Sequence, residues 1–487
     1  MTASNRETSV RRLASEILLK VDIQKAYADI LLDQEIRTGK LGERDRALLT
    51  ELVYGTLRWR GTIDARLSNH LRRPLVDTDP FIRNLLRVTL YQLLFLDKIP
   101  DYAAVNEAVQ LAKKRGGGKV AGFVNGVLRN FLRRNIETAA PQAADDSIAT
   151  LAMEYSHPEW LVKRCLDYFG LEAAKALMRA NNERSPLVLR VNTLKSNRKA
   201  LLDLFEENGV TAVATQWSPE GVWVQSGSAV DQLPGFQRGL FQVQGEASQL
   251  VTHLLGPQPG ERILDACAAP GGKATHIAEL MNNTGEVTAV DISVRGVKKI
   301  RENAARLELT SIRASCADVS RDFAGSFLGQ FDRVLVDAPC SGLGTLRSHP
   351  EIKWHRNPSD IERLSRLQRK ILDRVASCLK PGGVLVYSTC TLTPDENEQI
   401  VESFLQAHRE FELENAAGYL PEQAKWSPTG EAVASSSTPV ERNPEREPPT
   451  KVGARVEGPM VQGSYFMALP HLHNTDGFFA ARMRKVA

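Results

Sequence analysis

Two short apolar runs in this chain each end in polar residues followed by a cysteine. Val334–Val336 leads into Asp337-Ala338-Pro339-Cys340, and Val384–Tyr387 leads into Ser388-Thr389-Cys390. Such runs are typical of buried strands in a parallel sheet, and proline cannot extend a central strand. Because ligands bind at the carboxyl ends of the strands in an open α/β sheet, the sequence predicts a carboxylate and two thiols at the rim of one pocket.

A loop of small residues predicts a nucleotide-type site. The strand-like run Ile263–Cys267 precedes Ala268-Ala269-Pro270-Gly271-Gly272-Lys273, and a helix is expected from Ala274 to Met281. Small residues between a strand and a helix let the backbone approach a ligand closely. The loop matches neither the G-x-G-x-x-G pattern nor the P-loop, which argues against a dinucleotide or a triphosphate.

Two acids further along are candidates for cofactor contacts. Asp291 ends the strand-like run Glu286–Val290. It follows the glycine loop by about 20 residues, the usual place for an acid that binds ribose hydroxyls. Asp318 follows the next apolar stretch and could lie near an adenine. The alternative for Asp318 is an acid that only caps a loop or a helix.

Charge is unevenly distributed along the 487 residues, a length that suggests two to four domains. Residues 1–136 carry 24 Lys and Arg against 15 Asp and Glu, whereas the remainder carries 38 against 43. A basic head on a mildly acidic body favours an anionic partner such as nucleic acid. The alternative is a helical domain with an ordinary basic surface.

Cysteine and histidine usage predicts no metal site. None of the six cysteines forms a C-x-x-C pair. His349 and His355 could bind a metal, but the sequence shows no third ligand for them. The first residues lack an apolar signal core, and no apolar stretch is long enough to span a membrane, so we expect a cytoplasmic protein with reduced thiols and no membrane partner.

Periodicity divides the chain into three expected domains. Apolar residues recur at helical spacing over residues 9–135, with a helix end at Gly116–Gly118, and define a helical domain at 1–140. An Ala- and Gln-rich linker at 136–147 precedes a small α+β domain at 150–235. The sheet domain occupies 236–487, with a disordered insertion expected at 426–457.

Three shorter segments also yield expectations. Arg347–Arg356 mixes cations with a tryptophan, as a loop facing nucleic acid would. Pro394–Glu398 is expected to begin a helix with acids in its first turn, and Gly477–Met483 to form the closing edge strand of the sheet. His157 is expected to be structural rather than catalytic.

The helical head resembles the NusB family of RNA-binding domains. The residues that carry this resemblance are Tyr54-Gly55-Thr56-Leu57-Arg58, Ile99-Pro100, Asn106-Glu107-Ala108-Val109 and Phe123-Val124-Asn125-Gly126-Val127-Leu128-Arg129. The resemblance implies RNA or ribonucleoprotein binding, which fits the basic charge because phosphate contacts dominate such binding.

The body resembles the RNA cytosine-5 methyltransferases. Three stretches carry the resemblance: Asp265–Lys273, Asp337–Gly342 and Tyr387–Thr391. It implies a Rossmann-like catalytic domain that uses S-adenosylmethionine. It also implies that Cys267, Ala268, Ala269, Pro270, Gly271, Gly272, Lys273, Asp291, Asp318 and Asp337 bind the cofactor. The expected fold is therefore an all-α NusB-like domain, a small α+β domain and a Rossmann-like methyltransferase domain.

The resemblance also assigns roles to two thiols. Carbon 5 of cytosine becomes nucleophilic when a soft nucleophile adds at carbon 6, and cysteine suits that step. By the family pattern Cys390 attacks and Cys340 assists elimination; the residues alone leave the order open. A single cysteine of this kind would more often be a buried apolar thiol, but two at adjoining strand tips argue against that. Cys165, Cys316 and Cys378 are expected to be structural.

With the NusB-like head, the resemblance implies a monomeric enzyme acting on small-subunit ribosomal RNA rather than DNA. The alternatives are another RNA such as tRNA, or a ribosome-assembly factor that binds RNA without catalysis. All three diagnostic residues, Cys340, Cys390 and Asp337, are present, which favours an enzyme. One departure is Gly245, where the family pattern leads us to expect an acid; it puts a local cap or contact in doubt.

Overall fold

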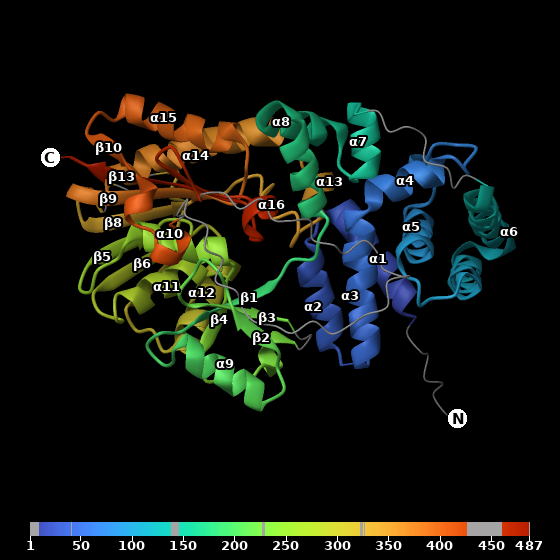
Figure 1. Cartoon of the computed structure of the whole chain (residues 1–487), viewed down its shortest axis with the longest axis horizontal. Helices are drawn as coiled ribbons and strands as arrows, with labels where there is room; N and C mark the ends of the chain where they lie inside the picture. The colour runs from blue at the N-terminus through green and yellow to red at the C-terminus, as the bar shows by residue number, and fades with distance from the viewer. Residues whose placement is uncertain are drawn as a thin grey trace, which may run out of the picture. The chain divides into compact units, whose positions relative to one another are not determined.

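The structure is a computed structural model whose described residues pack as two units (Figure 1). The first unit contains the chain up to Arg184 together with Leu346–Pro358, and the second contains Ser185–Thr345 and the chain from Ser359. The described residues are 9–39, 41–137, 146–225, 229–321, 325, 327–425 and 460–486, with side chains as far as residue 133 in the helix that ends at 137. The expected domain boundaries at residues 140, 150 and 235 stay a prediction.

The N-terminal helices of the first unit pack around one apolar core, as the helical spacing predicts. They are α1 (Val10–Gln24), α2 (Ala28–Arg37), α3 (Glu43–Arg58), α4 (Arg60–Ser68), α5 (Pro80–Phe95) and α6 (Asp101–Glu137), with the 3-10 turn η1 (Leu75–Asp77). Side chains cap two of the helix starts. Ser9 accepts a hydrogen bond from the Arg12 amide, and Asp79 accepts from the amides of Phe81 and Ile82.

The glycines at 116–118 interrupt α6, as expected. Gly116 and Gly117 leave helical geometry, and Gly117 has a φ of 73°, the left-handed region in which glycine commonly ends a helix. Helical backbone resumes directly afterwards, so two helical segments follow each other around a kink.

The first unit is completed by three further helices, one of them from the middle of the chain. They are α7 (Ile148–Glu154), α8 (Glu159–Asn181) and α13 (Ile352–His355). Lys353 of α13 is fully buried and donates hydrogen bonds to the carbonyl oxygens of Arg58 and Ser156 and to Oδ1 of Asn182. The Trp354 indole donates to the Leu57 carbonyl over 2.8 Å.

The expectation that Arg347–Arg356 faces nucleic acid is wrong for its buried cations. Arg347 is 3% exposed and Lys353 is 0% exposed. A run of cations with an aromatic residue does not reveal whether carbonyl oxygens or phosphates receive its hydrogen bonds, and here backbone carbonyls receive those of Lys353. His157 is buried, with Nδ1 2.7 Å from the Tyr155 carbonyl oxygen, as a structural histidine would be.

A small antiparallel sheet opens the second unit and confirms the expected α+β module. Its strand order is β2-β3-β1-β4. The elements are β1 (Leu187–Val191), α9 (Arg198–Glu207), β2 (Ala212–Ala214), β3 (Gly221–Val224), η2 (Val230–Gln232) and β4 (Phe241–Val243). Leu189, Leu201, Phe205, Val222 and Phe241 form its core.

The large sheet has the order β11-β12-β13-β9-β8-β5-β6-β7, and β10 pairs with β13. Its strands are β5 (Arg262–Asp265), β6 (Glu286–Asp291), β7 (Ile312–Cys316), β8 (Phe331–Asp337), β9 (Leu379–Thr389), β10 (Phe411–Glu414), β11 (Val461–Gln462), β12 (Tyr465–Ala468) and β13 (Phe478–Lys485). Strands β5 to β9 pair in parallel, whereas β13 runs antiparallel to β9. This is the expected α/β methyltransferase-type sheet.

Helices cover both faces of the large sheet (Figure 1). On one face lie α10 (Glu246–Leu255), α11 (Gly272–Leu280) and α12 (Val294–Leu307), and on the other lie α14 (Pro358–Ala376) and α15 (Glu398–Ala407). Short elements complete the unit: η4 (Pro394–Glu396), η5 (Ala416–Gly418), η6 (Glu422–Ala424) and α16 (Pro470–His473).

The structure corrects the expectation for the last strand. Residues Gly477–Met483 were expected at an edge, but β13 lies between β9 and β12 and also pairs with β10. The insertion expected at 426–457 and most of the linker expected at 136–147 fall outside the described residues. Among the helices that are described, none combines the length and the apolar character needed to cross a membrane.

Candidate active site

The carboxyl ends of the central strands bring the predicted residues together. Asp265 ends β5 and pairs with Leu335 of β8, and Asp337 ends β8 and pairs with Ser388 of β9. The chain beyond β9 reaches Cys390 one residue later. Parallel pairing in this register therefore places the three motif stretches at one edge of the sheet, where α/β enzymes bind their ligands.

The glycine loop borders a cavity in the second unit. The cavity is lined by parts of β4 and α10 as well as by the loop, through Gln242, Val243, Gln244, Gly245, Ser248, Asp265, Cys267, Ala268, Ala269, Pro270, Gly272, Lys273 and Asp337. Gly271 does not line it. It has a φ of 101°, which favours glycine, and an added Cβ would lie 3.1 Å from the Ile300 Cα.

Arg190 of β1 binds the glycine loop through the Gly272 carbonyl oxygen. It is fully buried and donates to the Gly272 carbonyl over 2.8 Å, to both oxygens of Glu279 and to the side chain of Gln244. Buried charges are normally paired in this way. The same cation therefore joins the small sheet to α11 and to the polar side chain that lines the cavity.

Asp337 is held by two donors beside the cavity. Lys273 Nζ lies 2.6 Å from Asp337 Oδ2, and Ser388 Oγ donates to Asp337 Oδ1 over 2.8 Å. Lys273 Nζ also lies 5.1 Å from the centre of the Phe478 ring. These contacts orient both oxygens of the carboxylate.

Asp265 is the first residue of the motif stretch Asp265–Lys273, and its place in that stretch predicts no role for it. It is 0% exposed, and neither carboxylate oxygen has a partner in normal hydrogen-bond geometry. Burial and the nearby Asp337 raise its pKa to about 7, although Lys273 acts in the opposite direction. The position of Asp265 in the motif predicts only that it ends a strand. The raised pKa could not be predicted from the motif, because it comes from the packing around the strand.

Asp291 and Asp318 do not line the cavity. Asp291 accepts hydrogen bonds from the amides of Ala269 and Ser293, so it fixes the glycine loop. Asp318 accepts from the Ser320 amide and hydroxyl and forms an ion pair with Arg321. The hydrogen bond from the Ser320 side chain lowers the pKa of Asp318, and slight burial opposes this effect without cancelling it.

The two cysteines meet, as the strand tips predict. Their Sγ atoms lie 3.3 Å apart, and the Gly344 amide donates to the Cys390 carbonyl over 2.9 Å. The hydrogen bond with Cys390, together with burial, raises the pKa of Cys340 well above its usual range. Of the remaining cysteines Cys165 and Cys378 are buried, whereas Cys316 is exposed and is not part of the core.

Glu396 connects the loops that carry the two cysteines. It is 0% exposed and accepts from the amide and hydroxyl of Ser341, which follows Cys340, and from the Thr393 hydroxyl. Ser341 Oγ also lies 2.8 Å from Thr391 Oγ1. The expected helix start with acids in its first turn is confirmed: the 3-10 helix η4 begins at Pro394 and carries Asp395 and Glu396, and α15 follows from Glu398. The burial of Glu396 was not expected.

Gly245 stands where an acid was expected. It is the N-cap of α10 through its backbone, without a side-chain cap. The nearest atom to an added Cβ would be Asp476 Oδ2, at 3.7 Å. An acid at this position would thus bring a second carboxylate close to Asp476.

Comparison with known proteins agrees with this geometry. The chain is 40% identical to the probable ribosomal RNA small subunit methyltransferase B of Bacillus subtilis (strain 168) over 480 residues, which cover 99% of each chain. It is 39% identical to ribosomal RNA small subunit methyltransferase B of Escherichia coli O1:K1 / APEC over 376 residues, covering 77% of this chain and 85% of the relative. The chain belongs to the RsmB family of methyltransferases.

Three family descriptions match successive parts of this RsmB-family chain. NusB family matches residues 8–133, the ferredoxin-like domain of RsmF/B-like methyltransferases matches 157–231, and 16S rRNA methyltransferase RsmB/F matches 252–484. The expected NusB-like head, small α+β domain and methyltransferase body are thereby confirmed, and so is the expectation that the protein is an enzyme.

Solved structures show the same architecture for the RsmB family chain. The crystal structure of the protein PH0851 aligns over 100% of both chains with a TM-score of 0.77 and 26% identity. A methyltransferase homolog protein from Pyrococcus horikoshii aligns over 70% of this chain and 100% of its own, with a TM-score of 0.55 and 28% identity.

Proposed function

We propose that the protein methylates carbon 5 of a cytosine in small-subunit ribosomal RNA, with S-adenosylmethionine as the methyl donor and through a covalent cysteine adduct. The observation that carries the proposal is the 3.3 Å contact between Cys340 and Cys390 beside a glycine loop. Support for the RNA comes from the NusB family match and from relatives named as ribosomal RNA small subunit methyltransferases.

The residues around the cavity fit S-adenosylmethionine. This donor carries a sulfonium and an ammonium cation and supplies an electrophilic methyl group. The cavity is lined by Cys267–Pro270, Gly272 and Lys273 of the loop and by the carboxyl groups of Asp265 and Asp337. Within the described residues the oxygens of Asp265 make no hydrogen bond of normal geometry, although the Cys267 backbone lies near enough to lower the pKa of this group. A ligand that donates to such a weakly partnered buried carboxyl group would be favoured.

Asp291 and Asp318 retain their proposed roles toward the nucleoside part of the donor. Asp291 accepts a backbone hydrogen bond with each oxygen, and every carboxylate oxygen can accept a second one. Asp291 can therefore bind ribose hydroxyls while it still accepts the hydrogen bond from the Ala269 amide.

Catalysis is proposed to begin with attack of the Cys390 thiolate on carbon 6 of the cytosine. The new sulfur–carbon bond makes carbon 5 nucleophilic. When bound, S-adenosylmethionine would supply the methyl group to carbon 5 by cleavage of its methyl–sulfonium bond and leave as the neutral thioether S-adenosylhomocysteine. Removal of the proton from carbon 5 re-forms the carbon 5–carbon 6 double bond and expels Cys390 as a thiolate. The target base must be unstacked for this chemistry, so a loop or flipped nucleotide is the expected substrate.

The cysteine pair places a second thiol beside the attacking one. The two Sγ atoms lie 3.3 Å apart, and either can be the donor of the hydrogen bond between them. The assignment of the attack to Cys390 follows the family resemblance. Cys340, after losing its own proton to solvent, is then proposed to take the proton from carbon 5 as a thiolate.

The test is methyl transfer from labelled S-adenosylmethionine to unmodified small-subunit ribosomal RNA, followed by digestion to nucleosides. The expected product is labelled 5-methylcytidine, with no product from Cys390→Ala. Cys316→Ala, which changes an exposed cysteine away from the pair, is the matched control and should keep full activity. Label on another nucleoside, or equal activity of Cys390→Ala, would overturn the proposal; label on transfer RNA alone would correct the substrate.

One chain is proposed to suffice for the reaction. The glycine loop, both acids of the cavity and both cysteines lie in the second unit of a single chain. Light scattering during size-exclusion chromatography of the active fraction should give the monomer mass near 53.9 kDa.

A further inference from the structure

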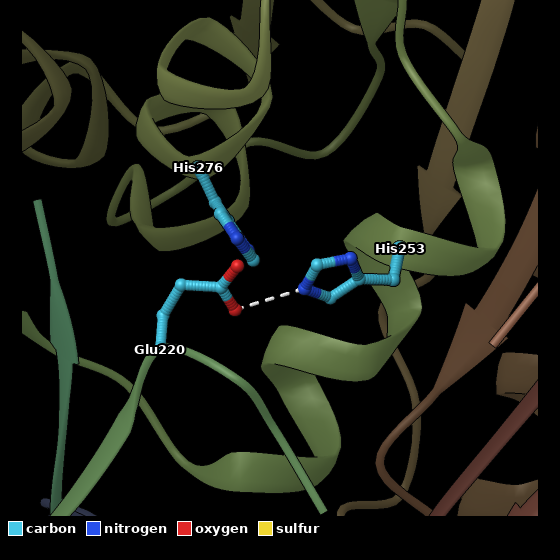
Figure 2. A group of neighbouring side chains, drawn as sticks. All are labelled: Glu220, His253 and His276. Atoms are coloured by element: carbon cyan, nitrogen blue, oxygen red, sulfur yellow. Dashed lines mark hydrogen bonds and ion pairs between the residues drawn. The ribbon is translucent and has the colours of Figure 1, made fainter. Parts of the chain in front are cut away.

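A second cluster of chemically active side chains lies within the second unit, apart from the cysteine pair. It consists of Glu220, in the turn before β3, His253 of α10 and His276 of α11 (Figure 2). Each residue offers one donor atom, and these atoms lie within 4.8 Å of one another. His253 Nε2 is 2.9 Å from Glu220 Oε2, and Figure 2 shows the His276 ring directed at the same space.

His276 has no partner in this arrangement. It is 1% exposed, and neither ring nitrogen makes a hydrogen bond within the described residues. Buried polar atoms in native proteins nearly always have a partner, and each missing one costs about 1–3 kcal/mol. Two unpaired nitrogens on one buried ring therefore indicate a ligand that completes the site.

The three side chains contact one another directly. Glu220 Oε2 lies 2.9 Å from His253 Nε2, and the His276 ring packs edge-on against the His253 ring with centroids 5.3 Å apart. The adjacent buried cation, Arg190, is already paired with Glu279 at 2.8 Å.

We propose that Glu220, His253 and His276 form a metal site that binds a divalent transition-metal ion, with Zn²⁺ as the best match. Two imidazoles and one carboxylate are a donor set that zinc uses. Bonds of about 2.1 Å in a tetrahedral site place donors about 3.4 Å apart. The donor atoms now lie within 4.8 Å of one another, so the donor–donor distances must change by up to about 1.4 Å, which side-chain rotation can supply.

The position of the site gives it a structural role. Glu220 lies in the turn that leads into β3 of the small sheet. Helix α11 begins with Gly272 and Lys273 of the glycine loop, and His276 follows within one helical turn. A bound ion would tie the small sheet to α10 and α11 and stabilise the folded second unit by mass action. The inference does not depend on the methyl-transfer proposal.

The test uses the full chain. Protein purified without chelator is assayed for zinc by elemental analysis, stripped with a chelator and titrated with Zn²⁺ and with Co²⁺, whose visible absorption reports ligand geometry. We expect one equivalent per chain and a lower melting temperature after stripping. His276→Leu and Glu220→Gln should each weaken binding roughly 100-fold or more, because even indirect partners of a metal ligand contribute about 10–100-fold.

Two controls separate this site from other metal-binding groups. His408→Gln changes a histidine that also contacts two acids, Asp373 and Glu410, and should bind zinc as the unchanged protein does. Cys340→Ala/Cys390→Ala removes the thiol pair and should also retain the ion. Absence of zinc binding by folded protein, or zinc binding that follows the cysteines instead of His276, would overturn the inference.

Discussion

The Sγ atoms of Cys340 and Cys390 lie 3.3 Å apart, although 50 residues separate them in the chain. The contact arises because β8 and β9 are parallel neighbours, so that both strands end at the same edge of the sheet. The contact between the two thiols therefore depends on both strand tips keeping this register.

Replacing Cys340 should trap the enzyme on its substrate. In Cys340→Ala the attack by Cys390 and the methyl transfer still occur, but the base that removes the carbon-5 proton is missing. We expect a protein–RNA adduct that survives denaturing electrophoresis and turnover reduced roughly 100-fold or more. The double variant Cys340→Ala/Cys390→Ala should form no adduct. An adduct that forms without Cys390 would contradict the assignment.

Removing the charge of Glu396 should slow the reaction without weakening cofactor binding. Glu396→Gln loses the charge that holds Ser341, with hydrogen bonds worth about 1.5–3 kcal/mol each when one partner is charged. We expect kcat to fall about 10-fold or more while the dissociation constant for S-adenosylmethionine stays within about 2-fold. Glu402→Gln, on the exposed side of α15, is the control and should change neither value. If Glu396→Gln lowered kcat and the affinity for S-adenosylmethionine equally, Glu396 would not act by positioning the loop that carries Cys340.

Asp265→Asn should stabilise the ligand-free protein at high pH. The folded-state pKa is about 7 against an ordinary 3.8, so ionisation costs the folded state stability as the pH rises between these values. The variant should gain on the order of 1–4 kcal/mol above pH 7, and the gain should vanish near pH 4. Urea midpoints measured from pH 4 to pH 8 test this.

Asp332→Asn provides the control of opposite sign for that series. Burial opposes ionisation there, but the contact with Lys380 and other donors lowers the pKa of Asp332 overall. Its charge therefore stabilises the fold above the ordinary pKa, and the variant should lose stability at neutral pH. Two variants that both shift in the same direction would contradict the pKa assignments.

Lys353→Met should destabilise the first unit. The change leaves the carbonyl oxygens of Arg58 and Ser156 and Oδ1 of Asn182 without their donor, in a buried place. The expected loss is on the order of 3 kcal/mol, seen as earlier unfolding by hydrogen exchange in α3 and α8. Lys163→Met removes an exposed cation whose ion pair with Asp167 lies at the surface, and it should have almost no effect. If Lys353→Met left the hydrogen-exchange protection of α3 unchanged, the bond from Lys353 to the Arg58 carbonyl would not stabilise that helix.

The sequence predicts those parts of the site that depend on local pattern. Apolar runs with polar ends locate β8, β9 and the contact between Cys340 and Cys390, and the small-residue loop locates the cavity. Residues whose role arises from tertiary packing escape such reasoning. Asp265 has a raised pKa because folding buries it and brings Asp337 close, and Glu396 contacts Ser341 only in the folded chain.

Two wrong expectations have the same origin. The cations of Arg347–Arg356 are compatible with either phosphates or buried carbonyl oxygens, and only packing shows that Lys353 has the second kind of partner. The resemblance to the methyltransferase fold led us to expect the last strand at an edge, but pairing with β9 and β12 places it inside the sheet. The metal cluster was missed because Glu220, His253 and His276 are far apart in sequence and follow no ligand spacing.

The first unit contains residues that are synthesised long after its other helices. The hydrogen bond between Lys353 and Arg58 spans 295 residues, and α13 follows directly after the strand tip that carries Cys340. While the chain is being made, the N-terminal helices emerge from the ribosome with the acceptors for Lys353 still unsatisfied. The first unit therefore reaches its finished form only after the strand tip that carries Cys340 has been translated, so this unit is never complete in a nascent chain that lacks Cys340.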